Sequence, residues 1–297
     1  MPETGLSALI LTKNEELDLP GCLRSISWCD DIHVLDSGST DRTCDIARRF
    51  GATVAIKSYP DSAGLFGGDE AAHRNWSLRH TPFKHAWVLL LDADERVTPE
   101  LARSVQSAVG NPGDHVAFRI RRRDFYLDTW LKHVQISALY LRLFKPENVK
   151  YERLINPVSI ADGPVASITG YLDHFPFSKG IAHWFERHNA YSSLEAEQIL
   201  RNRRAGKSFS LRKALTSADI HERRTNQKEI FYRLPCRPLA KFVIVYLAKR
   251  GFLDGRAGFQ YALLQSLYEQ MIVMKVNEAG TRIHDPGLRE TERRDTP

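Results

Sequence analysis

The sequence lacks any apolar run long enough to cross a membrane. A spanning helix needs roughly 20 apolar residues, whereas the longest candidate, Phe242 to Ala248, has seven and is flanked by Lys241, Lys249 and Arg250. The N-terminus MPETGLSALILTKNEE also lacks a basic segment followed by a long apolar core, so no signal peptide is expected. These absences predict a cytoplasmic protein, with any membrane contact at the inner face of the cytoplasmic membrane.

Cysteine is scarce as well. The four cysteines are Cys22, Cys29, Cys44 and Cys236, and no two of them have the CxxC spacing of a zinc or redox site. Reduced thiols are therefore expected rather than a disulfide framework. Internal repeats and low-complexity segments are also absent, so an ordinary globular fold with its own core is expected for 297 residues.

The net charge of +6 conceals an uneven distribution. Residues 1–100 hold 10 Lys and Arg against 16 Asp and Glu, whereas the remaining residues hold 32 against 20. An acidic first third suits a cation site, and a basic remainder suits anionic lipid, phosphate or nucleic acid. A solubilising surface explains any single basic residue equally well. Because the basic residues are dispersed and no recognised motif accompanies them, no nucleic-acid partner is expected.

The most informative stretch runs from Trp87 to Glu95 and reads WVLLLDADE. Five apolar residues followed by carboxylates are typical of a buried parallel strand, and open α/β sheets bind ligands at the carboxyl ends of such strands. Residues i and i+2 of an extended chain point the same way, so Asp92 and Asp94 are expected to converge on one hard cation. An Asp-x-Asp pair by itself is also common in solvated turns.

Two earlier strands are expected to bring polar side chains to the same edge. Residues 6–12 and 32–35 are short apolar runs, followed by Thr-Lys-Asn-Glu-Glu at 12–16 and Asp-Ser-Gly-Ser-Thr-Asp at 36–41. Helical patterns alternate with these strands, which predicts an α/β fold with a mostly parallel, doubly wound sheet. The carboxyl ends of parallel strands meet at one rim, so acid and amide side chains are expected to gather there.

The pattern changes after these strands. Thr98-Pro99-Glu100 opens a helix with an N-cap and a proline at the first helical position. Residues 115–121 and 137–144 then read as strands, and more irregular strands continue to about His174. From residue 181 the chain reads as helical.

Four motifs in order resemble the family 2 glycosyltransferases: LTKNEE, VLDSGSTD, HRNWSL and LDADERVTPEL. They are similar in particular to the bacterial branch that includes lipopolysaccharide-core β-glucosyltransferases. The resemblance implies a GT-A fold with a C-terminal helical extension and an inverting transfer of sugar from a nucleotide-diphospho-sugar, with UDP the expected nucleotide. It also implies a surface-glycan, lipopolysaccharide or lipid-linked acceptor. The expected division is 1–178 for the transferase domain (donor half 1–112, acceptor half 113–178), 179–280 for the helical region and 281–297 for a disordered tail.

The resemblance also implies which residues bind the donor. In the family the first-strand turn and the second-strand aspartate hold base and ribose, and a basic residue before the Asp-x-Asp strand faces the diphosphate. Asp36 has turn formation as its alternative role, and Arg74 has that of a solvated helix charge. The residues expected to bind the donor are Thr12, Asn14, Glu15, Asp36, Ser39, Arg74, Asp92 and Ala93.

A divalent cation, Mn²⁺ or Mg²⁺, is the expected cofactor. Asp92 and Asp94 are its expected ligands, and Asp94 is also expected to be catalytic, because the cation neutralises charge on the departing diphosphate. His174 matches a histidine that closes the family's strand region and is the third expected ligand. A hydrogen-bonded core histidine is the alternative.

The catalytic base is where the sequence departs from the family. Relatives often carry a glutamate just after a segment like Arg153-Leu154-Ile155, but this chain has Asn156-Pro157 there. Glu152 is the expected substitute, with Asp124 and Asp128 in reserve.

Two apolar-rich helices are expected near 238–250 and 256–277. Their basic flanks suit an anionic membrane surface, although packing on the core or a homodimer interface explains them equally well. Two further functions stay open. A nucleotidyltransferase usually has a glycine-rich loop after its first strand, which residues 12–16 do not supply. A non-catalytic, transferase-like scaffold is favoured by Pro157.

Overall fold

The computed structural model describes residues 5–60, 65–135, 139–152, 157–206, 209–217 and 220–283. The chain separates into two compact units, Met1–Ser178 and Lys179–Pro297. Residues 153–156, which include the segment where the family's base is expected, lie outside the described ranges. Across the described residues, no helix combines the length and the apolar character that crossing a bilayer requires.

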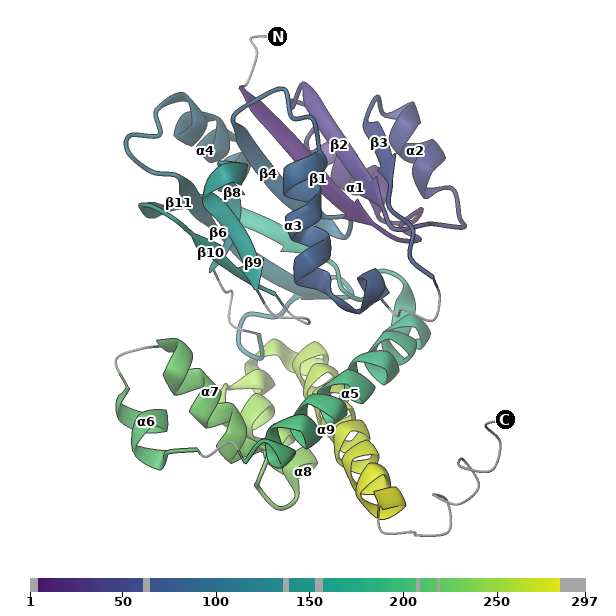
Figure 1. The fold of residues 1–297 in the computed structure, drawn as a ribbon, viewed down its shortest axis with the longest axis vertical. Helices are drawn as coiled ribbons and strands as arrows, with labels where there is room; N and C mark the ends of the chain where they lie inside the picture. Colours follow the sequence, from purple (N-terminus) through teal and green to yellow (C-terminus); the bar gives the residue numbers. More distant parts are fainter. Residues whose placement is uncertain are drawn as a thin grey trace, which may run out of the picture. The chain divides into compact units, whose positions relative to one another are not determined.

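The first unit is built on one large sheet with the strand order β3-β2-β1-β4-β8-β6-β11-β5 (Figure 1). The strands β3, β2, β1 and β4 are all parallel, as expected for strands joined by helices. The predicted fold class is therefore confirmed for this half of the sheet. These strands are β1 (Leu6–Thr12), β2 (Asp31–Asp36), β3 (Thr53–Ile56) and β4 (Trp87–Asp92).

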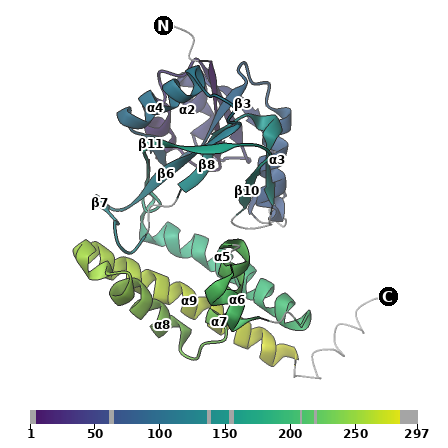
Figure 2. The same ribbon diagram turned by 90° about the vertical axis from the view of Figure 1, so that its left-hand side faces the viewer.

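Helices cover both faces of this parallel half, and Figure 2 shows α3 on one side of the sheet and α2 and α4 on the other. Ala8 and Ile10 of β1 share a core with α1 and α4. Leu9 and Leu11 point to the opposite face and share a second core with α3. Burial on both faces explains why β1 and β4 are continuously apolar. The helices are α1 (Leu19–Ser25), α2 (Thr43–Arg49), α3 (Glu70–His80) and α4 (Pro99–Gly110), with a 3₁₀ turn, η2 (Leu65–Gly68), before α3.

The predicted cap of α4 is confirmed. The Thr98 side chain accepts a hydrogen bond from the Leu101 N–H, and Pro99 occupies the first helical position.

The second half of the sheet mixes parallel and antiparallel strands. β8 runs antiparallel to both β4 and β6, and β11 runs parallel to β6 and antiparallel to β5. β9 and β10 form a separate antiparallel pair. These strands are β5 (Glu95–Val97), β6 (Ala117–Tyr126), β7 (Thr129–Trp130), β8 (Leu139–Phe144), β9 (Val149–Glu152), β10 (Val158–Ala161) and β11 (Val165–His174), with a 3₁₀ turn, η3 (Pro146–Asn148), before β9.

A bulge in β11 sets the register of its last residues. Ser167 pairs with Arg119 and Tyr171 with Arg121, so β11 gains two residues over β6 between these pairs. Beyond the bulge, His174 stands beside Asp124. Continuing the register of Ser167 without the bulge would instead have placed His174 beside Tyr126.

The second unit consists of helices. The expected single helix near 208–224 is two shorter ones, α6 and α7, and α9 continues to Ile283, inside the segment expected to be a tail. Residues 284–297 lie outside the described ranges. The helices are α5 (Gly180–Arg204), α6 (Leu211–Thr216), α7 (Ile220–Phe231), α8 (Arg237–Val243), a π-helical turn η4 (Ile244–Ala248), a 3₁₀ turn η5 (Gly251–Asp254) and α9 (Gly255–Ile283).

Gly170 lies within the bulge at φ +89°, and a Cβ there would come within 2.6 Å of the backbone of Leu101. Gly51 has φ +79° but open space around it. Gly51→Ala should therefore cost only the left-handed strain, about 1 kcal/mol. Gly170→Ala adds overpacking against α4 and should lower the free energy of unfolding by roughly 2 kcal/mol more. Urea denaturation of both variants measures the difference, and equal losses would contradict the proposed crowding.

Candidate functional site

The turns that follow β1 and β2 are tied to each other by hydrogen bonds. The Asn14 N–H donates to Ser39 Oγ at 2.7 Å, and Asn14 Oδ1 accepts from the Thr40 N–H at 2.8 Å. The Glu15 N–H donates to Thr43 Oγ1 at 2.7 Å. Asn14 adopts a left-handed φ of 55°, which asparagine tolerates better than most residues. The structure thus brings together the residues of both turns that were expected to bind a donor.

Asp36 lies at the centre of these turns and is buried. One carboxylate oxygen accepts from the hydroxyls of Thr12 and Ser39, and the other accepts from the N–H groups of Gly38 and Ser39. A carboxylate with this many internal donors shapes a turn. The turn-forming role therefore describes Asp36 in this structure, and its influence on a ligand would act through the shape of the loop.

Asp92, at the end of β4, lies between two arginines. Arg74 of α3 approaches Oδ1 at 3.2 Å, and Arg142 of β8 approaches Oδ2 at 2.7 Å. Burial alone would raise the pKa of Asp92, but Arg142 and Arg74 hold it well below its usual value. Asp92 is therefore a carboxylate that fixes the positions of two guanidinium groups.

Arg142 also bonds to a fully buried carboxylate. It donates to Glu95 Oε1 at 2.7 Å, while the other Glu95 oxygen accepts from the Asp92 N–H at 2.9 Å. The ends of β4, β5 and β8 are joined by these contacts. Burial raises the pKa of Glu95, opposed by the charge of Arg142. Buried charges of this kind require partners, so each member of the group holds the others in place.

Asp94 and His174 form a second part of the rim. His174 Nε2 lies 3.3 Å from Asp94 Oδ2, and its Nδ1 bonds to Asp124. Arg122 forms an ion pair with Asp124 at 3.1 Å. Burial alone would lower the pKa of His174, but Asp94 and the hydrogen bonds to Asp124 and Asp94 raise it to about 9. The imidazole is consequently charged at neutral pH in this arrangement.

Asp94 and His174 fit a divalent cation as a pair of ligands. Two ligands at right angles, each about 2.1 Å from a metal, lie about 3 Å apart, close to the 3.3 Å between Asp94 Oδ2 and His174 Nε2. Asp124 on the other ring nitrogen is the carboxylate that commonly orients a metal-binding histidine. The described residues form no group of three or more His, Cys, Asp and Glu suited to a metal, so diphosphate oxygens would complete the coordination.

Two expected roles do not match the structure. Asp92 has both oxygens engaged by arginines, which leaves the expected set of Asp92, Asp94 and His174 without one ligand. Glu152 is exposed and pairs with Lys150 at 2.9 Å. Its neighbour Tyr151 is buried and lies near Arg74. Because successive residues of a strand point to opposite faces, Glu152 points away from the cluster around Asp92.

The remaining candidates occupy varied positions. Ala93 is buried, and its carbonyl accepts from Arg96. Arg74 is held by Glu70 as well as Asp92, so it is not a solvated helix charge. Asp128 is exposed in the turn between β6 and β7, whereas Asp124 is buried beside His174.

Arg142 and Arg122 were not among the residues expected at the site. A signal existed for Arg142, which stands inside the otherwise apolar strand LYLRLF, because an arginine is almost never fully buried unless it is paired. The partner could not be named from the sequence, since Asp92 and Arg142 are 50 residues apart.

The sequence pattern of the glycosyl transferase family 2 domain matches residues 7–165, more than half of the chain. The match spans both halves of the sheet, from β1 to the start of β11. The chain belongs to glycosyltransferase family 2.

Relatives of this transferase include the lipopolysaccharide core biosynthesis glycosyltransferase LpsC of Rhizobium meliloti (strain 1021). It is 24% identical over 283 residues, which are 93% of each chain. An uncharacterized glycosyltransferase of Rickettsia bellii is 32% identical over 157 residues, 52% of this chain and 49% of the relative.

Solved structures with a similar fold include S. aureus TarS 1–349, with 14% identity, a TM-score of 0.41 and coverage of 89% of this chain and 91% of that one. Glucosyl-3-phosphoglycerate synthase of Mycobacterium tuberculosis, crystallised with Mn²⁺, UDP and glucosyl-3-phosphoglycerate, has 23% identity and a TM-score of 0.33. That match covers 40% of this transferase and 44% of the synthase.

Replacing Arg142 by methionine should strongly destabilise the first unit. The variant leaves Asp92 and Glu95 without their shared guanidinium, and breaking a buried ion pair from one side costs about 3–5 kcal/mol. Arg121→Met, at an exposed position on β6, is the matched control and should change stability by less than about 0.5 kcal/mol. Urea denaturation measures both. Similar stabilities for the two variants would show that the Arg142 pairs do not hold the rim together.

Proposed function

We propose that this transferase moves a sugar from a UDP-sugar to a hydroxyl group of a lipopolysaccharide or lipid-linked acceptor, with inversion at the anomeric carbon. Asp94 and His174 would hold the divalent cation. The observation that carries the proposal is their 3.3 Å separation at the carboxyl end of β4, with Asp124 supporting the imidazole. When bound, a divalent cation neutralises charge that develops on the departing diphosphate.

The acceptor class rests on the similarity to LpsC. That protein is named for lipopolysaccharide core biosynthesis, and the similarity extends over 93% of both chains. It therefore includes residues beyond the family 2 domain, where acceptor preference is expected to be encoded.

The rim supplies a donor pocket in two parts. The linked turns containing Asn14 and Ser39 would shape the site for uracil and ribose, because their hydrogen bonds fix the backbone around Asp36. Arg74 and Arg142, held by Asp92, would place positive charge near the diphosphate. Anchored arginines need no reorganisation when an anion arrives, which favours binding.

The direction in which Glu152 points removes it from this proposal. A base must lie within hydrogen-bond reach of the acceptor hydroxyl, and Glu152 is exposed on the side of β9 opposite Tyr151. Asp124 is also a weak choice. Burial would raise its pKa, but the hydrogen bond from His174 and the charge of Arg122 lower it, and a lowered pKa makes a poorer proton acceptor.

Asp94→Asn should abolish metal-dependent donor binding. The wild type is expected to bind UDP at least tenfold more tightly with Mn²⁺ than with a chelator, because the cation bridges Asp94 to the diphosphate. Asp94→Asn should bind UDP as the chelated wild type does, with or without Mn²⁺. Isothermal titration calorimetry measures the affinities, and UDP release in the presence of lipopolysaccharide core fragments should fall at least 100-fold.

The matched control is Asp114→Asn, at an exposed position before β6, which should retain the full effect of Mn²⁺. The same assay with UDP-, GDP- and dTDP-sugars tests the nucleotide. An unchanged response to Mn²⁺ in Asp94→Asn would refute the metal assignment. Absence of turnover by the wild type with every donor and acceptor would refute the proposed activity and favour a scaffold.

Glu152→Gln should transfer sugar at a rate within about threefold of the wild type. Its carboxylate faces solvent and Lys150, so the substitution removes only a surface ion pair of small value. Glu147→Gln, at another exposed position just before β9, is the comparison. Measurement of kcat with saturating donor decides the matter, and a loss of 100-fold or more confined to Glu152→Gln would restore this residue as the base.

A further inference from the structure

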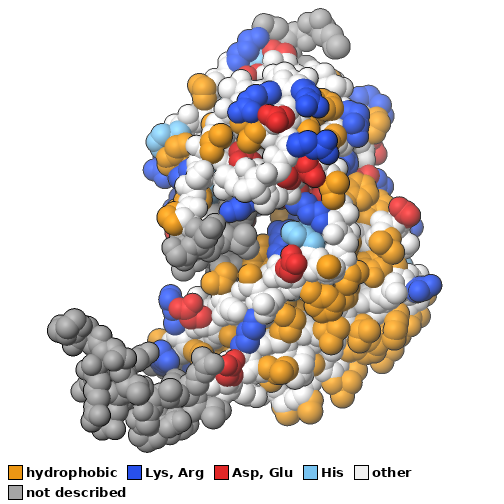
Figure 3. Space-filling model, turned by 90° about the vertical axis from the view of Figure 1, so that its right-hand side faces the viewer, with side chains coloured by type: hydrophobic (Ala, Val, Ile, Leu, Met, Phe, Trp, Pro, Cys, Tyr) orange, Lys and Arg blue, Asp and Glu red, His pale blue; other side chains and the backbone are white. Residues whose placement is uncertain are grey.

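The second unit exposes a continuous apolar surface along α8, η4, η5 and α9. On α8 and η4, Leu239 and Leu247 are 63% and 54% exposed. On α9, Phe259, Leu263, Leu267 and Met274 are all exposed and recur at helical spacing on one side. The opposite side of α9, which includes Ala262 and Ile272, is buried. Figure 3 shows hydrophobic side chains gathered over this unit.

The turn between the two helices extends this surface. Phe252 and Leu253 of η5 are about half exposed. The Tyr246 ring lies 6.4 Å from Phe252 and 5.6 Å from Phe259, so aromatic side chains link η4, η5 and α9. We call the exposed side chains of these segments the apolar face. They are Leu239, Val243, Ile244, Leu247, Phe252, Leu253, Phe259, Leu263, Leu267 and Met274.

Basic residues accompany the apolar face, and exposed carboxylates do not. Residues 231–277 are described throughout, and their only acidic side chains, Asp254 and Glu269, are both buried. Glu269 is occupied by Arg237 at 2.6 Å. The exposed charges in this segment include Lys249, Arg250 and Arg256, and are all positive. A surface with this composition is suited to an apolar partner that carries negative charge.

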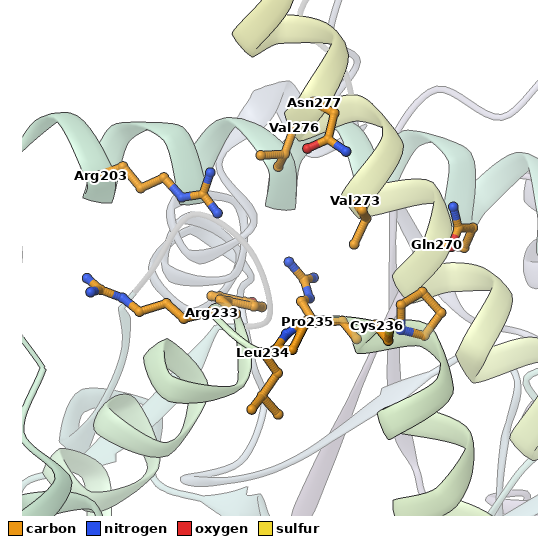
Figure 4. Close-up of a pocket in the computed structure, with 12 residues that line it drawn as sticks. Arg203, Arg233, Leu234, Pro235, Cys236, Gln270, Val273, Val276 and Asn277 are labelled. Carbon is orange, nitrogen blue, oxygen red and sulfur yellow. The ribbon is translucent and has the colours of Figure 1, made fainter.

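A pocket bordered by three arginines lies at the start of α8. It has a volume of about 410 Å³. Figure 4 shows the side chains of Arg203 and Arg233 at one end of it. Arg237 is only 4% exposed, and its Nε has no hydrogen-bond partner among the described residues. A buried donor without an acceptor is costly, so an anion entering the pocket would satisfy a group that the protein leaves unpaired.

The pocket borders the apolar face. Gln270 and Asn277 line it, and they follow Leu267 and Met274 by three residues each on α9. Residues three and four apart on a helix lie on the same side. An anionic group in the pocket would therefore be close to apolar groups on the face, as the phosphate and acyl chains of a phospholipid are.

We propose that the apolar face docks on an anionic phospholipid bilayer and that the arginine pocket receives a lipid phosphate. A second copy of the chain fits less well, because pairing two such faces would bring like charges together at their edges. A bilayer supplies both an apolar interior and negative headgroups. The assignment depends on the second unit alone and is independent of the transfer activity.

Flotation with lipid vesicles tests the docking. The full-length protein should float with vesicles of phosphatidylcholine and phosphatidylglycerol at 50 mM salt, and much less with phosphatidylcholine alone. Raising the salt to 0.5 M should weaken binding, because screening reduces the attraction between surface charges. UDP binding measured in parallel reports whether the first unit remains folded in each preparation.

The double variant Leu247→Glu, Leu253→Glu should bind mixed vesicles at least about tenfold more weakly, because each substitution removes apolar area from the bilayer and adds a repelled charge. Leu215→Glu, at a leucine of α6 that is 77% exposed and lies off the apolar face, is the matched control and should float as the wild type does. Arg203→Gln and Arg233→Gln should each weaken binding to mixed vesicles roughly fivefold while leaving binding to phosphatidylcholine unchanged.

Three results would overturn the proposal. One is a wild type that does not float with mixed vesicles at low salt. Another is equal binding by the Leu247→Glu, Leu253→Glu variant and the Leu215→Glu control. The third is a stable dimer in analytical ultracentrifugation that the double variant dissociates, combined with no flotation, which would assign the apolar face to a second copy. Far-ultraviolet circular dichroism of every variant establishes that the helices remain formed.

Discussion

The Arg142 guanidinium and the two carboxylates it joins are the contact on which the rim of this transferase depends. Asp92 ends β4, Glu95 begins β5, and Arg142 arrives from β8, so one side chain fixes three strand ends. In a buried site these charges tolerate neither separation nor a missing member. The turn between β4 and β5 is therefore held in one shape, and that shape presents Asp94 toward His174.

The β11 bulge contributes the other side of the same arrangement. Its two extra residues place His174 beside Asp124 and within 3.3 Å of Asp94. Gly170 permits the bulge to lie against the backbone of α4, where no larger residue fits. An irregularity in a strand thus positions a side chain at the rim, a common association of bulges with functional sites.

The two units present different chemistry. The first has a rim of paired charges, where carboxylates and arginines are balanced and a cation or diphosphate alters that balance locally. The second has an apolar face with basic residues and an arginine pocket. If a lipid-linked glycan is the acceptor, a membrane-binding second unit would keep the enzyme at the surface where that acceptor is found.

Local sequence determined much of the fold. The apolar runs of β1 and β4, the cap at Thr98-Pro99 and the apolar patterns of α8 and α9 predicted elements that the structure contains, because each depends on residues close together in the chain. The motifs around Asn14, Asp36 and Asp94 also indicated which rim would carry the site. The expectation for Glu152 failed at this level, since its nearness in sequence to the family's usual base says nothing about which face of β9 it occupies.

Tertiary structure decided which charges meet. Asp92 was expected to bind metal, and the structure instead pairs it with Arg74 and with Arg142, a residue 50 positions away that no local pattern connects to it. The meeting of His174 with Asp124 depends likewise on a bulge whose register is set by packing against α4. The sequence alone determined the strands and the polar ends they carry. The roles of the individual charged groups followed only from folding, because the stability of a buried charge depends on partners that chain folding brings near.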